Sequence, residues 1–328
     1  MLKDYHDKRL MKKGVENALK IMYDKCNYGL NLGEGRKQMK SNLTMEIDEE
    51  TMENSKSNAP SQTAVKYFPL MSQLDKSIKK KKELLDSSFA RYAVRSMFAC
   101  LFLALGTAIA FYIAIRTQEA IPGLEKMSYA FMFSWSLVMI LFMNAELGTS
   151  NMLYMTVGVY RKKIHVSFAA KLLFTCILFN LIGGVLCGYL LSLTAPFSHL
   201  EPGNYMFTGI AGKLAKPTLQ ILVEGMFANI VVNTAVLVSM RMKDDAGKVM
   251  AIIFIIFIFA FLGYEHVIAN FPAFSLAYFA SHGTIEGMNA ASVLHNLFFT
   301  LIGNFVGGGL VMGLGYAWLN KTETSYVD

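Results

Sequence analysis

Charged side chains and cysteines are scarce in this chain, and each scarcity excludes something. Charged residues make up 17% of the 328 positions against 54% for hydrophobic residues, and the hydrophobic ones are concentrated beyond residue 90. Four cysteines are present, and their spacing fits neither a disulfide framework nor a zinc or redox pair. The three that fall within apolar runs, Cys100, Cys176 and Cys187, are therefore expected to act as small packing residues.

Motifs for catalysis and for nucleic-acid binding are missing as well. The sequence contains no nucleophile–base set, metal cluster or cofactor motif, so we predict neither an enzyme nor a bound cofactor or metal. The net charge of +7 comes from basic residues scattered along the flanks of apolar runs, with no nucleic-acid reader motif between them. A secretory signal peptide is not expected, because no apolar stretch follows the N-terminal charges.

Long apolar runs dominate the rest of the sequence. The uninterrupted runs approach or exceed the roughly 20 residues that a helix needs to cross a bilayer. We therefore predict an all-α integral membrane protein with six transmembrane segments, with a soluble six-helix protein as the alternative. The segments are 90–115, 127–160 (interrupted at 144–151), 168–194, 219–240, 249–280 (interrupted at 263–270) and 293–319.

The two interruptions share one pattern in the two halves of the chain. Glu146 is followed five residues later by Asn151, and Glu265 is followed five residues later by Asn270. Each half of an interrupted run is too short to span a bilayer alone, so the breaks must be shielded by protein or line a cavity. Interrupted segments at matching positions of two halves point to a substrate site between repeats. The pattern favours a channel or transporter for a small solute.

A phrase of asparagine and glycines repeats in the third segment of each half. Asn180 precedes Gly183 and Gly184, and Asn304 precedes the glycines at 307–309. Glycine lets helix backbones approach each other closely, which suits tight helix crossings in a membrane. The repetition supports a duplicated architecture of three plus three segments.

Basic residues are unevenly divided between the loops. The loops at 161–163 and 241–248, together with the run at 79–82, carry most of the cations, whereas the opposite loops carry fewer. The positive-inside rule then predicts that these loops and both termini lie in the cytoplasm, with the chain crossing the cytoplasmic membrane several times.

The first 65 residues differ in composition from the rest. They are polar and predict a disordered cytoplasmic extension, unless translation begins at a later methionine. Residues 66–89 predict a basic amphipathic helix on the cytoplasmic membrane surface, 90–320 a channel domain, and 321–328 a short cytoplasmic tail. A membrane sensor or scaffold that works through the extension is one alternative function.

Three motifs resemble those of the formate/nitrite transporter family. They are Glu-Leu-Gly-Thr-Ser-Asn at 146–151, Gly-Tyr-Glu-His-Val-Ile-Ala-Asn at 263–270 and Gly-Asn-Phe-Val-Gly-Gly-Gly at 303–309. The resemblance runs from Leu70 to about Leu319. It implies an aquaporin-like inverted repeat with broken second and fifth helices, assembled as a homopentamer with one pore in each protomer.

The resemblance also implies the substrates. Small monovalent anions of weak acids are expected, with formate first and nitrite, hydrosulfide, lactate or acetate as further candidates, passing through a channel or proton-coupled facilitator. An aquaporin-like pore for neutral solutes is the alternative.

A histidine and a threonine are expected at the pore centre. In the family, the residue that matches His266 faces the residue that matches Thr149 across the pore. An imidazole can hold and donate a proton near neutral pH, and a threonine hydroxyl can donate or accept a hydrogen bond. The pair could therefore bind an anion or accompany its neutralisation.

Apolar constrictions are expected on both sides of that centre, since an ion-tight path needs collars that exclude water. The family pattern assigns Phe133 and Phe259 to the extracellular collar, and Leu137 and Leu147 to the central or cytoplasmic one. Gly148 stands where formate channels carry a bulky aromatic residue, which predicts a slimmer loop and argues against strict selectivity for formate.

A lysine and several polar residues complete the expected site. Lys213 matches a vestibule lysine and is expected to attract anions, with a snorkelling interfacial lysine as the alternative. We expect the two loop glutamates to accept hydrogen bonds from backbone N–H groups freed by the helix breaks, and the two loop asparagines to act from the other end. Two further asparagines either orient His266 or bridge helices. These supporting residues are Glu146, Asn151, Asn229, Glu265, Asn270 and Asn304.

Overall fold

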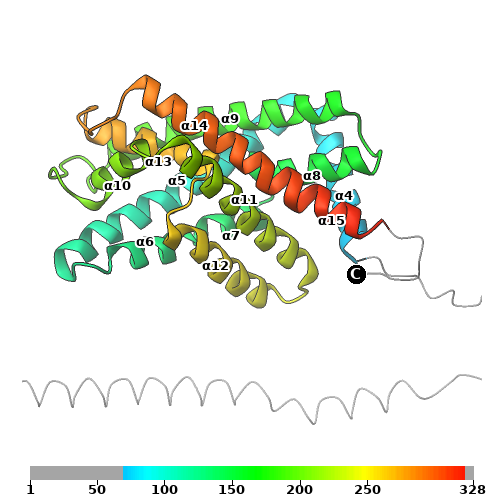
Figure 1. Cartoon of the computed structure of the whole chain (residues 1–328), viewed down its shortest axis with the longest axis horizontal. Coiled ribbons are helices and arrows are strands. Elements are labelled where there is room, and N and C mark those ends of the chain that lie inside the picture. Colours follow the sequence, from blue (N-terminus) through cyan, green and yellow to red (C-terminus); the bar gives the residue numbers. More distant parts are fainter. Residues whose placement is uncertain (1–68, 322–328) are drawn as a thin grey trace, which may run out of the picture. The chain divides into compact units, whose positions relative to one another are not determined.

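The computed structural model describes residues 69–321, and every regular element in that range is a helix (Figure 1). The predictions for residues 1–65 and for 322–328 lie outside the described residues. The elements are α4 (Pro69–Ser87), α5 (Phe89–Ala120), α6 (Glu125–Phe133), α7 (Trp135–Phe142), α8 (Gly148–Tyr160), α9 (Val166–Ser192), α10 (Tyr205–Leu214), α11 (Thr218–Arg241), α12 (Asp245–Leu262), α13 (Val267–Ala280), α14 (Ala290–Asn304), the π-helix η1 (Phe305–Leu314) and α15 (Gly315–Leu319).

The apolar runs form the helices that their lengths predict. Within residues 69–321, five helical stretches are long and apolar enough to cross a membrane, namely Phe89–Ala120, Val166–Ser192, Thr218–Arg241, Asp245–Leu262 and Ala290–Leu319. The second predicted segment is built from α6, α7 and α8, and the fifth from α12 and the shorter apolar helix α13. The all-helical membrane fold with a broken second and fifth segment is therefore confirmed.

Both breaks begin with a residue in the left-handed region of backbone conformation. Asn144 follows α7 with φ of 51°, and Gly263 follows α12 with φ of 76°. Such a residue ends a helix after its last turn, and glycine adopts the conformation without strain. The irregular stretches are shorter than predicted, because α8 already begins at Gly148 and α13 at Val267.

The third helix of each half lies against the first helix with no space between the backbones. A Cβ atom placed on Gly183 would lie 2.8 Å from the carbonyl oxygen of Met97, and one on Gly307 would lie 2.0 Å from the carbonyl oxygen of Met226. Side chains larger than hydrogen are excluded at both positions, which explains the repeated glycine phrase. The two contacts also pair Met97 with Met226 as equivalent positions of the two halves.

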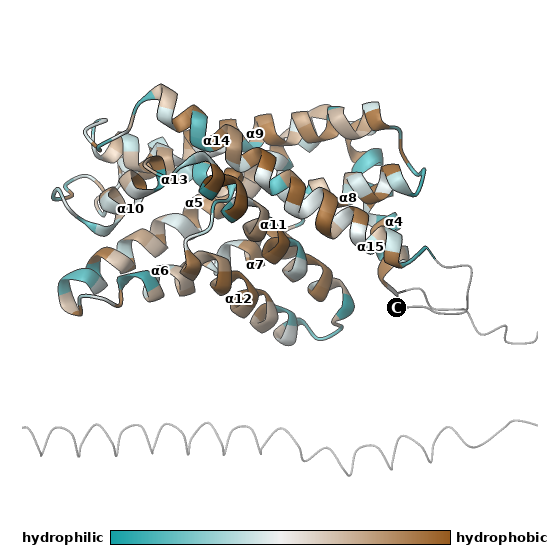
Figure 2. Ribbon diagram, viewed as in Figure 1, coloured by the Kyte–Doolittle hydropathy of each residue, from teal (hydrophilic) through white to brown (hydrophobic). Residues whose placement is uncertain are grey.

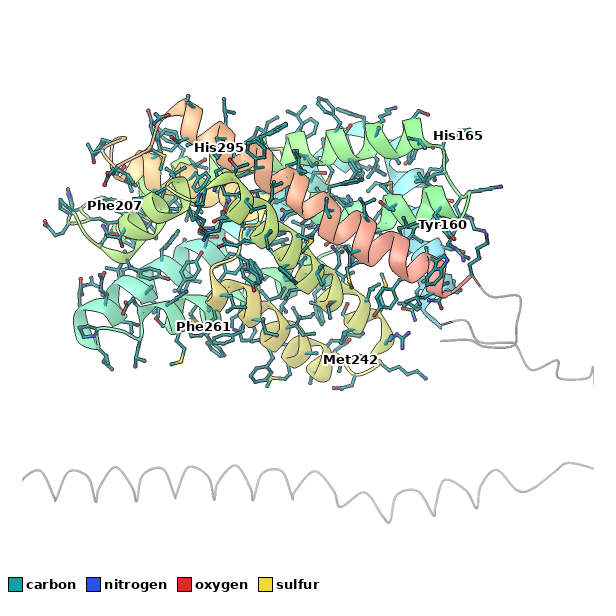
Figure 3. The ribbon with its side chains drawn as sticks, in the orientation of Figure 1. Tyr160, His165, Phe207, Met242, Phe261 and His295 are labelled. Carbon is teal, nitrogen blue, oxygen red and sulfur yellow. The ribbon has the colours of Figure 1, made fainter. Side chains whose placement is uncertain are left out.

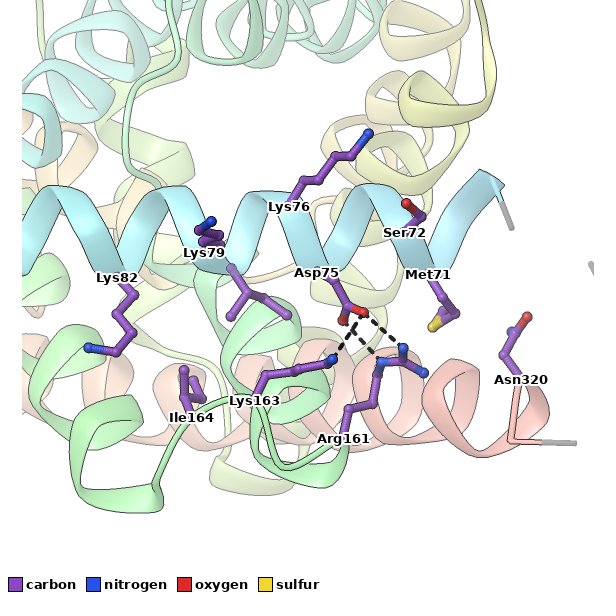
Figure 4. A pocket seen from close by; sticks show the side chains of 11 residues that line it. Met71, Ser72, Asp75, Lys76, Lys79, Lys82, Arg161, Lys163, Ile164 and Asn320 are labelled. Atoms are coloured by element: carbon purple, nitrogen blue, oxygen red, sulfur yellow. Dashed lines mark hydrogen bonds and ion pairs between the residues drawn. The ribbon is translucent and has the colours of Figure 1, made fainter. Parts of the chain in front are cut away.

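The amphipathic helix α4 is present, but its apolar face is covered by the protein. Leu74 and Ile78 are 0% and 2% exposed and belong to a cluster that includes Leu153 on α8. A bidentate pair between Arg161 and Asp75, with distances of 3.0 and 2.9 Å, ties α4 to the loop between α8 and α9 (Figure 4). The apolar face of α4 therefore packs against the protein, and the position of this helix at the cytoplasmic membrane surface stays a prediction.

Hydrophobic residues predominate along the helices (Figure 2), and many of the large ones are exposed. Phe174 on α9 and Phe254 on α12 are 70% and 61% exposed. Exposed apolar surface of this kind marks contact with lipid or with another protein. In Figure 3, Tyr160, His165 and Met242 lie towards one end of the helices, which we name the α4 end, and Phe207 and His295 lie towards the other, which we name the α10 end.

Candidate functional site

The two helix breaks meet at a histidine and a threonine. The Nε2 atom of His266 lies 2.8 Å from the Oγ1 atom of Thr149, and both residues are buried. His266 is the N-cap residue of α13, and Thr149 lies in the first turn of α8. The predicted proximity of these two side chains is therefore found in the structure, with one side chain supplied by each half of the chain.

The hydrogen bonds of His266 define which nitrogen carries its proton. The backbone N–H of Ala269 donates to Nδ1 at 3.2 Å, so Nδ1 must present a lone pair. In a neutral imidazole the hydrogen then sits on Nε2, which donates it to the hydroxyl oxygen of Thr149. Thr149 therefore keeps its own hydroxyl hydrogen for another acceptor. The site presents a hydrogen-bond donor at the point where the two loops meet.

A narrow apolar cavity adjoins His266. Its volume is about 10 Å³, which is close to the minimum that a single water molecule needs. The rings of Phe133 and Phe259 pack edge to face with centroids 5.7 Å apart, and the ring of Phe259 lies 5.9 Å from that of His266. The cavity is lined by Leu103, Phe133, Ser136, Leu137, Ile140, Leu147, Val232, Ile256, Phe259 and His266.

The four expected collar residues Phe133, Leu137, Leu147 and Phe259 thus surround one cavity. Sequence reasoning missed Ile140, which follows Leu137 by three residues on α7 and shares its helix face. That spacing could have identified it.

Gly148 does not line this cavity. A Cβ atom on Gly148 would lie 2.9 Å from Ile177 on α9, 3.0 Å from the Oδ1 atom of Asn180 and 3.3 Å from Ile268. The position therefore faces α9 and the start of α13, and a larger residue would collide with them. The assignment of Gly148 to the constriction stays a prediction, and the contacts of this residue favour a packing role at the start of α8.

Asn180 holds the first break from the side of α9. Its Oδ1 atom accepts the N–H of Gly148 at 2.9 Å, and its Nδ2 atom donates to the carbonyl oxygens of Ser96 and Glu146 at 2.6 and 3.0 Å. Asn180 was noticed in the sequence only as part of the glycine phrase. Its side chain satisfies one of the N–H groups that a helix start leaves without an intrahelical partner.

Asn304 holds the second break in the same way. Its Oδ1 atom accepts the N–H of Val267 at 2.9 Å, and its Nδ2 atom donates to the carbonyl oxygens of Gly225 and Glu265 at 2.7 and 3.0 Å. Asn229 donates to the carbonyl oxygens of Thr149 at 3.2 Å and of Asn304 at 2.7 Å. Both asparagines therefore fix backbone on either side of the central pair.

The two loop glutamates form ion pairs, which corrects the expectation that they accept backbone N–H groups. Glu146 accepts from Asn151 at 2.9 Å and from Lys81 at 2.7 Å. The backbone donors at the two breaks go instead to the asparagine side chains and to His266 Nδ1. A carboxylate with a nearby ammonium carries little net charge, so it repels an anion far less than a lone carboxylate would.

Glu265 repeats the arrangement with one more lysine. It accepts from Asn270 at 2.8 Å, from Lys213 at 3.0 Å and from Lys216 at 2.6 Å. Lys213 is thus bound to the loop of the second break. Lys81, its counterpart at the α4 end, was predicted only as a member of the basic run on the amphipathic helix.

Cys176 also takes part in the first break, beyond its expected packing role. Its Sγ atom lies 3.2 Å from the carbonyl oxygen of Glu146 and 3.3 Å from the Nδ2 atom of Asn151. The thiol is buried, so it fills space next to the loop and contributes weak hydrogen bonds there.

Comparison with known proteins identifies the family of the chain. Residues 70–318 match the family model for formate/nitrite transporters. The chain belongs to the formate/nitrite transporter family. Among curated relatives, it is 28% identical over 250 residues to the transporter YwcJ of Bacillus subtilis, covering 74% of this chain and 94% of YwcJ. It is 27% identical over 244 residues to the nitrite transporter NirC of Escherichia coli, covering 71% of this chain and 89% of NirC.

Solved structures of the family share the fold. An FNT family ion channel superposes with a TM-score of 0.71 at 24% identity, covering 76% of this chain and 98% of that one. A pentameric formate channel with formate bound superposes with a TM-score of 0.61 at 21% identity, covering 72% and 98%. These structures show the fold, and membership of the family makes the protein a membrane transport protein and not an enzyme.

Proposed function

We propose that the protein is a channel or proton-coupled facilitator for small monovalent anions of weak acids. Formate is the first candidate substrate, and nitrite, hydrosulfide, lactate and acetate are the others. The observation that carries the proposal is the hydrogen bond between Thr149 and His266 where the two broken helices meet. A polar pair enclosed by aromatic and aliphatic side chains suits a solute that sheds its water and still needs a hydrogen-bond donor.

The proposed passage has three stages. Cations near the mouths raise the local concentration of anions. Lys81 and Lys213 contribute little to this field, because each pairs with the carboxylate of a break. The apolar side chains next to His266 then strip the anion of water. At the centre the hydroxyl group of Thr149 donates a hydrogen bond to the anion. A carboxylate that takes up a proton from the solution at the mouth becomes a neutral acid. A neutral acid passes an apolar collar at far lower cost than an anion does.

The proposed orientation and assembly follow from charge and apolar surface. Basic residues gather at the α4 end, where Arg161 and Lys163 lie on the loop after α8, so we assign this end to the cytoplasm. The pentameric formate channel of similar fold supports a homopentamer with one pore in each protomer, embedded in the cytoplasmic membrane. Native mass spectrometry that shows only monomers under mild detergent conditions would contradict this assembly.

A pore for neutral solutes is the second candidate, and one observation favours it. Lys216 pairs with Glu224 at 2.5 Å, and Lys213 and Lys216 both pair with Glu265, so two cations and two anions balance at the α10 end. A cluster without excess charge does not select anions by its field. The α4 end differs in this respect, as described below.

Flux measurements with purified protein in liposomes separate the two candidates. The panel contains formate, nitrite, hydrosulfide, lactate, acetate and the neutral solute glycerol, each tested at two external pH values. Anion uptake that rises as the external pH falls, with little glycerol flux, supports the weak-acid facilitator. Glycerol flux that exceeds the flux of every anion at both pH values would establish the neutral-solute pore instead.

A further inference from the structure

The two halves of the chain carry opposite charges at equivalent positions. Asn180 donates to the carbonyl oxygen of Ser96, and its counterpart Asn304 donates to the carbonyl oxygen of Gly225. Ser96 and Gly225 therefore occupy equivalent positions in the two halves. The contacts of Gly183 with Met97 and of Gly307 with Met226 give the same correspondence. The preceding residues are Arg95 on α5 and Glu224 on α11, so a cation in one half stands where the other half has an anion.

Arg95 lies at the mouth of the first break. Its guanidinium group donates to the carbonyl oxygen of Asn144 at 3.2 Å, and Asn144 is the left-handed residue that ends α7. A cavity of about 510 Å³ opens here, lined by three cations, Lys80, Lys81 and Arg95, and by the carboxylate of Glu146. Because Lys81 pairs with Glu146, two cations remain in excess at this mouth.

The cavity at the α4 end adjoins the centre of the protein. Ile140 lines both this cavity and the apolar cavity next to His266. An anion collected near Arg95 therefore lies one side chain away from the constriction. Arg95 is exposed, so its guanidinium can reach solutes as well as the carbonyl oxygen that it binds.

At the equivalent place in the second half, the lysine that holds the break has its charge compensated, and the ammonium group of the exposed Lys126 lies near Gly263. The carbonyl oxygen of Gly263, the left-handed residue that ends α12, accepts from Lys216 at 2.9 Å. The same ammonium group binds Glu224 and Glu265, so the lysine that holds this break has its charge compensated. The side chains of Lys216 and Glu224 are both 16% exposed, which leaves little of this pair in contact with solvent.

We propose that Arg95 is an anion-capturing residue of the α4 end and that the opposite charges at positions 95 and 224 make the pore asymmetric. The inference rests on the proposed function as a pore for anions. Anions reach half-maximal flux at a lower concentration from the α4 end than from the α10 end, and the difference shrinks as salt screens the charges. A unit charge about 8 Å away from an anion in water changes the local anion concentration by about two- to three-fold at low ionic strength.

A passive pore restricts the form that the asymmetry can take. At equal concentrations on both sides and without a voltage or pH gradient, net flux is zero. The ratio of maximal flux to half-saturating concentration must therefore be equal in the two directions. The lower half-saturating concentration at the α4 end is accompanied by a proportionally lower maximal flux from that side, as expected when an anion is held more tightly at its starting point.

Side-resolved flux in vesicles of uncharged phosphatidylcholine tests the proposal. Insertion direction is determined with a membrane-impermeant maleimide on Lys162→Cys, in the loop after α8, in a Cys26→Ser background. Formate flux is then measured from each side at about 10 mM and about 500 mM salt. Arg95→Gln is compared with Arg91→Gln, which removes an exposed cation one turn earlier on the same helix, and with Arg95→Lys, which retains the charge.

The expected result is specific to charge, side and salt. Arg95→Gln raises the half-saturating concentration from the α4 end by about two- to three-fold at low salt, leaves the other side unchanged and has no effect at high salt. Arg95→Lys restores the original value, and Arg91→Gln leaves it unchanged. Glu224→Gln lowers the half-saturating concentration from the α10 end, because Lys216 then carries charge in excess.

Two contrary results are distinguishable. The role of Arg95 is overturned, and the proposed function is not, if formate or another panel anion crosses with equal half-saturating concentrations from both sides. The same holds if salt does not remove the effect of Arg95→Gln. If the intact protein carries none of the anions, the proposed function fails and this inference falls with it. Should Arg95→Gln fail to assemble, equal half-saturating concentrations from the two sides of the intact protein at low salt still overturn the proposal.

Discussion

The Nε2 atom of His266 lies 2.8 Å from the Oγ1 atom of Thr149, although 117 residues separate them in the chain. Each side chain comes from the break of a different broken helix, so the contact exists only when both halves are correctly placed. Two asparagines, Asn180 and Asn304, hold the two breaks by matching sets of hydrogen bonds. The position of the central pair therefore depends on helices α9 and α14 as much as on the breaks themselves.

Substitution of His266 by Asn or by Gln separates its two hydrogen bonds. The Oδ1 atom of Asn can replace Nδ1 as acceptor for the N–H of Ala269, and Asn is a favourable N-cap residue. The amide of Gln reaches the position of Nε2 and can contact Thr149, but the cap is lost at a cost of about 0.5–2 kcal/mol. We expect His266→Asn to keep the stability of the protein, and His266→Gln to lower it.

Neither amide can exchange a proton in the physiological range, so both variants test the role of the imidazole in flux. We expect the acid stimulation of weak-acid flux to be reduced in both, as measured by uptake into liposomes across a range of external pH. His266→Phe, which lacks both hydrogen bonds, is the comparison that shows the cost of losing cap and donor together. Wild-type flux at every pH in a stably assembled His266→Asn protein would show that the imidazole has no part in transport.

Gly148 offers a test of packing against selectivity. Because a Cβ atom at this position would meet Ile177 and Asn180, we expect Gly148→Ala to destabilise the protein by about 1–3 kcal/mol, as overpacking of a filled core does. Thermal unfolding of the assembled protein in detergent measures the loss. Gly209→Ala on α10 is the control, since a Cβ atom there meets nothing within 4 Å. A stable Gly148→Ala protein with altered anion selectivity would return this residue to the pore wall.

The two asparagines that hold the breaks predict a matched pair of effects. Asn180→Asp and Asn304→Asp each keep the Oδ1 acceptor but lose the two hydrogen bonds that Nδ2 donates to backbone carbonyls. Each lost bond leaves a buried carbonyl oxygen without that donor, which costs about 1–3 kcal/mol. We expect both variants to lower the melting temperature by similar amounts, and Asn320→Asp near the end of α15 to leave it unchanged. A large loss in one variant alone would mean that the two halves are not equivalent here.

Local patterns predicted the helices and the breaks, but not the bonds that join them. The length of an apolar run and the spacing from Glu146 to Asn151 are properties of adjacent residues, so the sequence alone indicated where the second segment is interrupted. The bond between Asn180 and Gly148 depends on how α9 crosses the start of α8. An asparagine inside an apolar run does not by itself reveal which backbone group it will meet.

The helical periodicity of α4 would have distinguished Lys81 from the other lysines of the basic run. Lys81 belongs to the basic run at 79–82, and sequence reasoning treated the four lysines alike. Lys81 follows the buried Leu74 by seven residues and the buried Ile78 by three, so it shares their face of α4. That face turns towards the protein, which is why this lysine meets Glu146 while its neighbours remain exposed.

The two break carboxylates predict unequal effects of removing a lysine. Glu265 has two lysine partners, so Lys213→Met leaves it paired with Lys216. Glu146 is paired with Lys81. Lys81→Met therefore leaves a buried carboxylate whose remaining hydrogen bond comes from the amide of Asn151. Loss of one member of a buried ion pair costs about 3–5 kcal/mol, because the remaining charge is left uncompensated.

We therefore expect Lys81→Met to reduce the yield of assembled protein and its melting temperature far more than Lys213→Met does. The double variant Lys81→Met/Glu146→Gln removes the uncompensated charge and should recover most of the loss, since the amide of Gln can still accept from Asn151. Size-exclusion chromatography and thermal unfolding in the same detergent measure both quantities. Equal destabilisation by the two single variants, or no recovery in the double variant, would show that Lys81 stabilises the protein through its packing on Tyr154 rather than through its charge on Glu146.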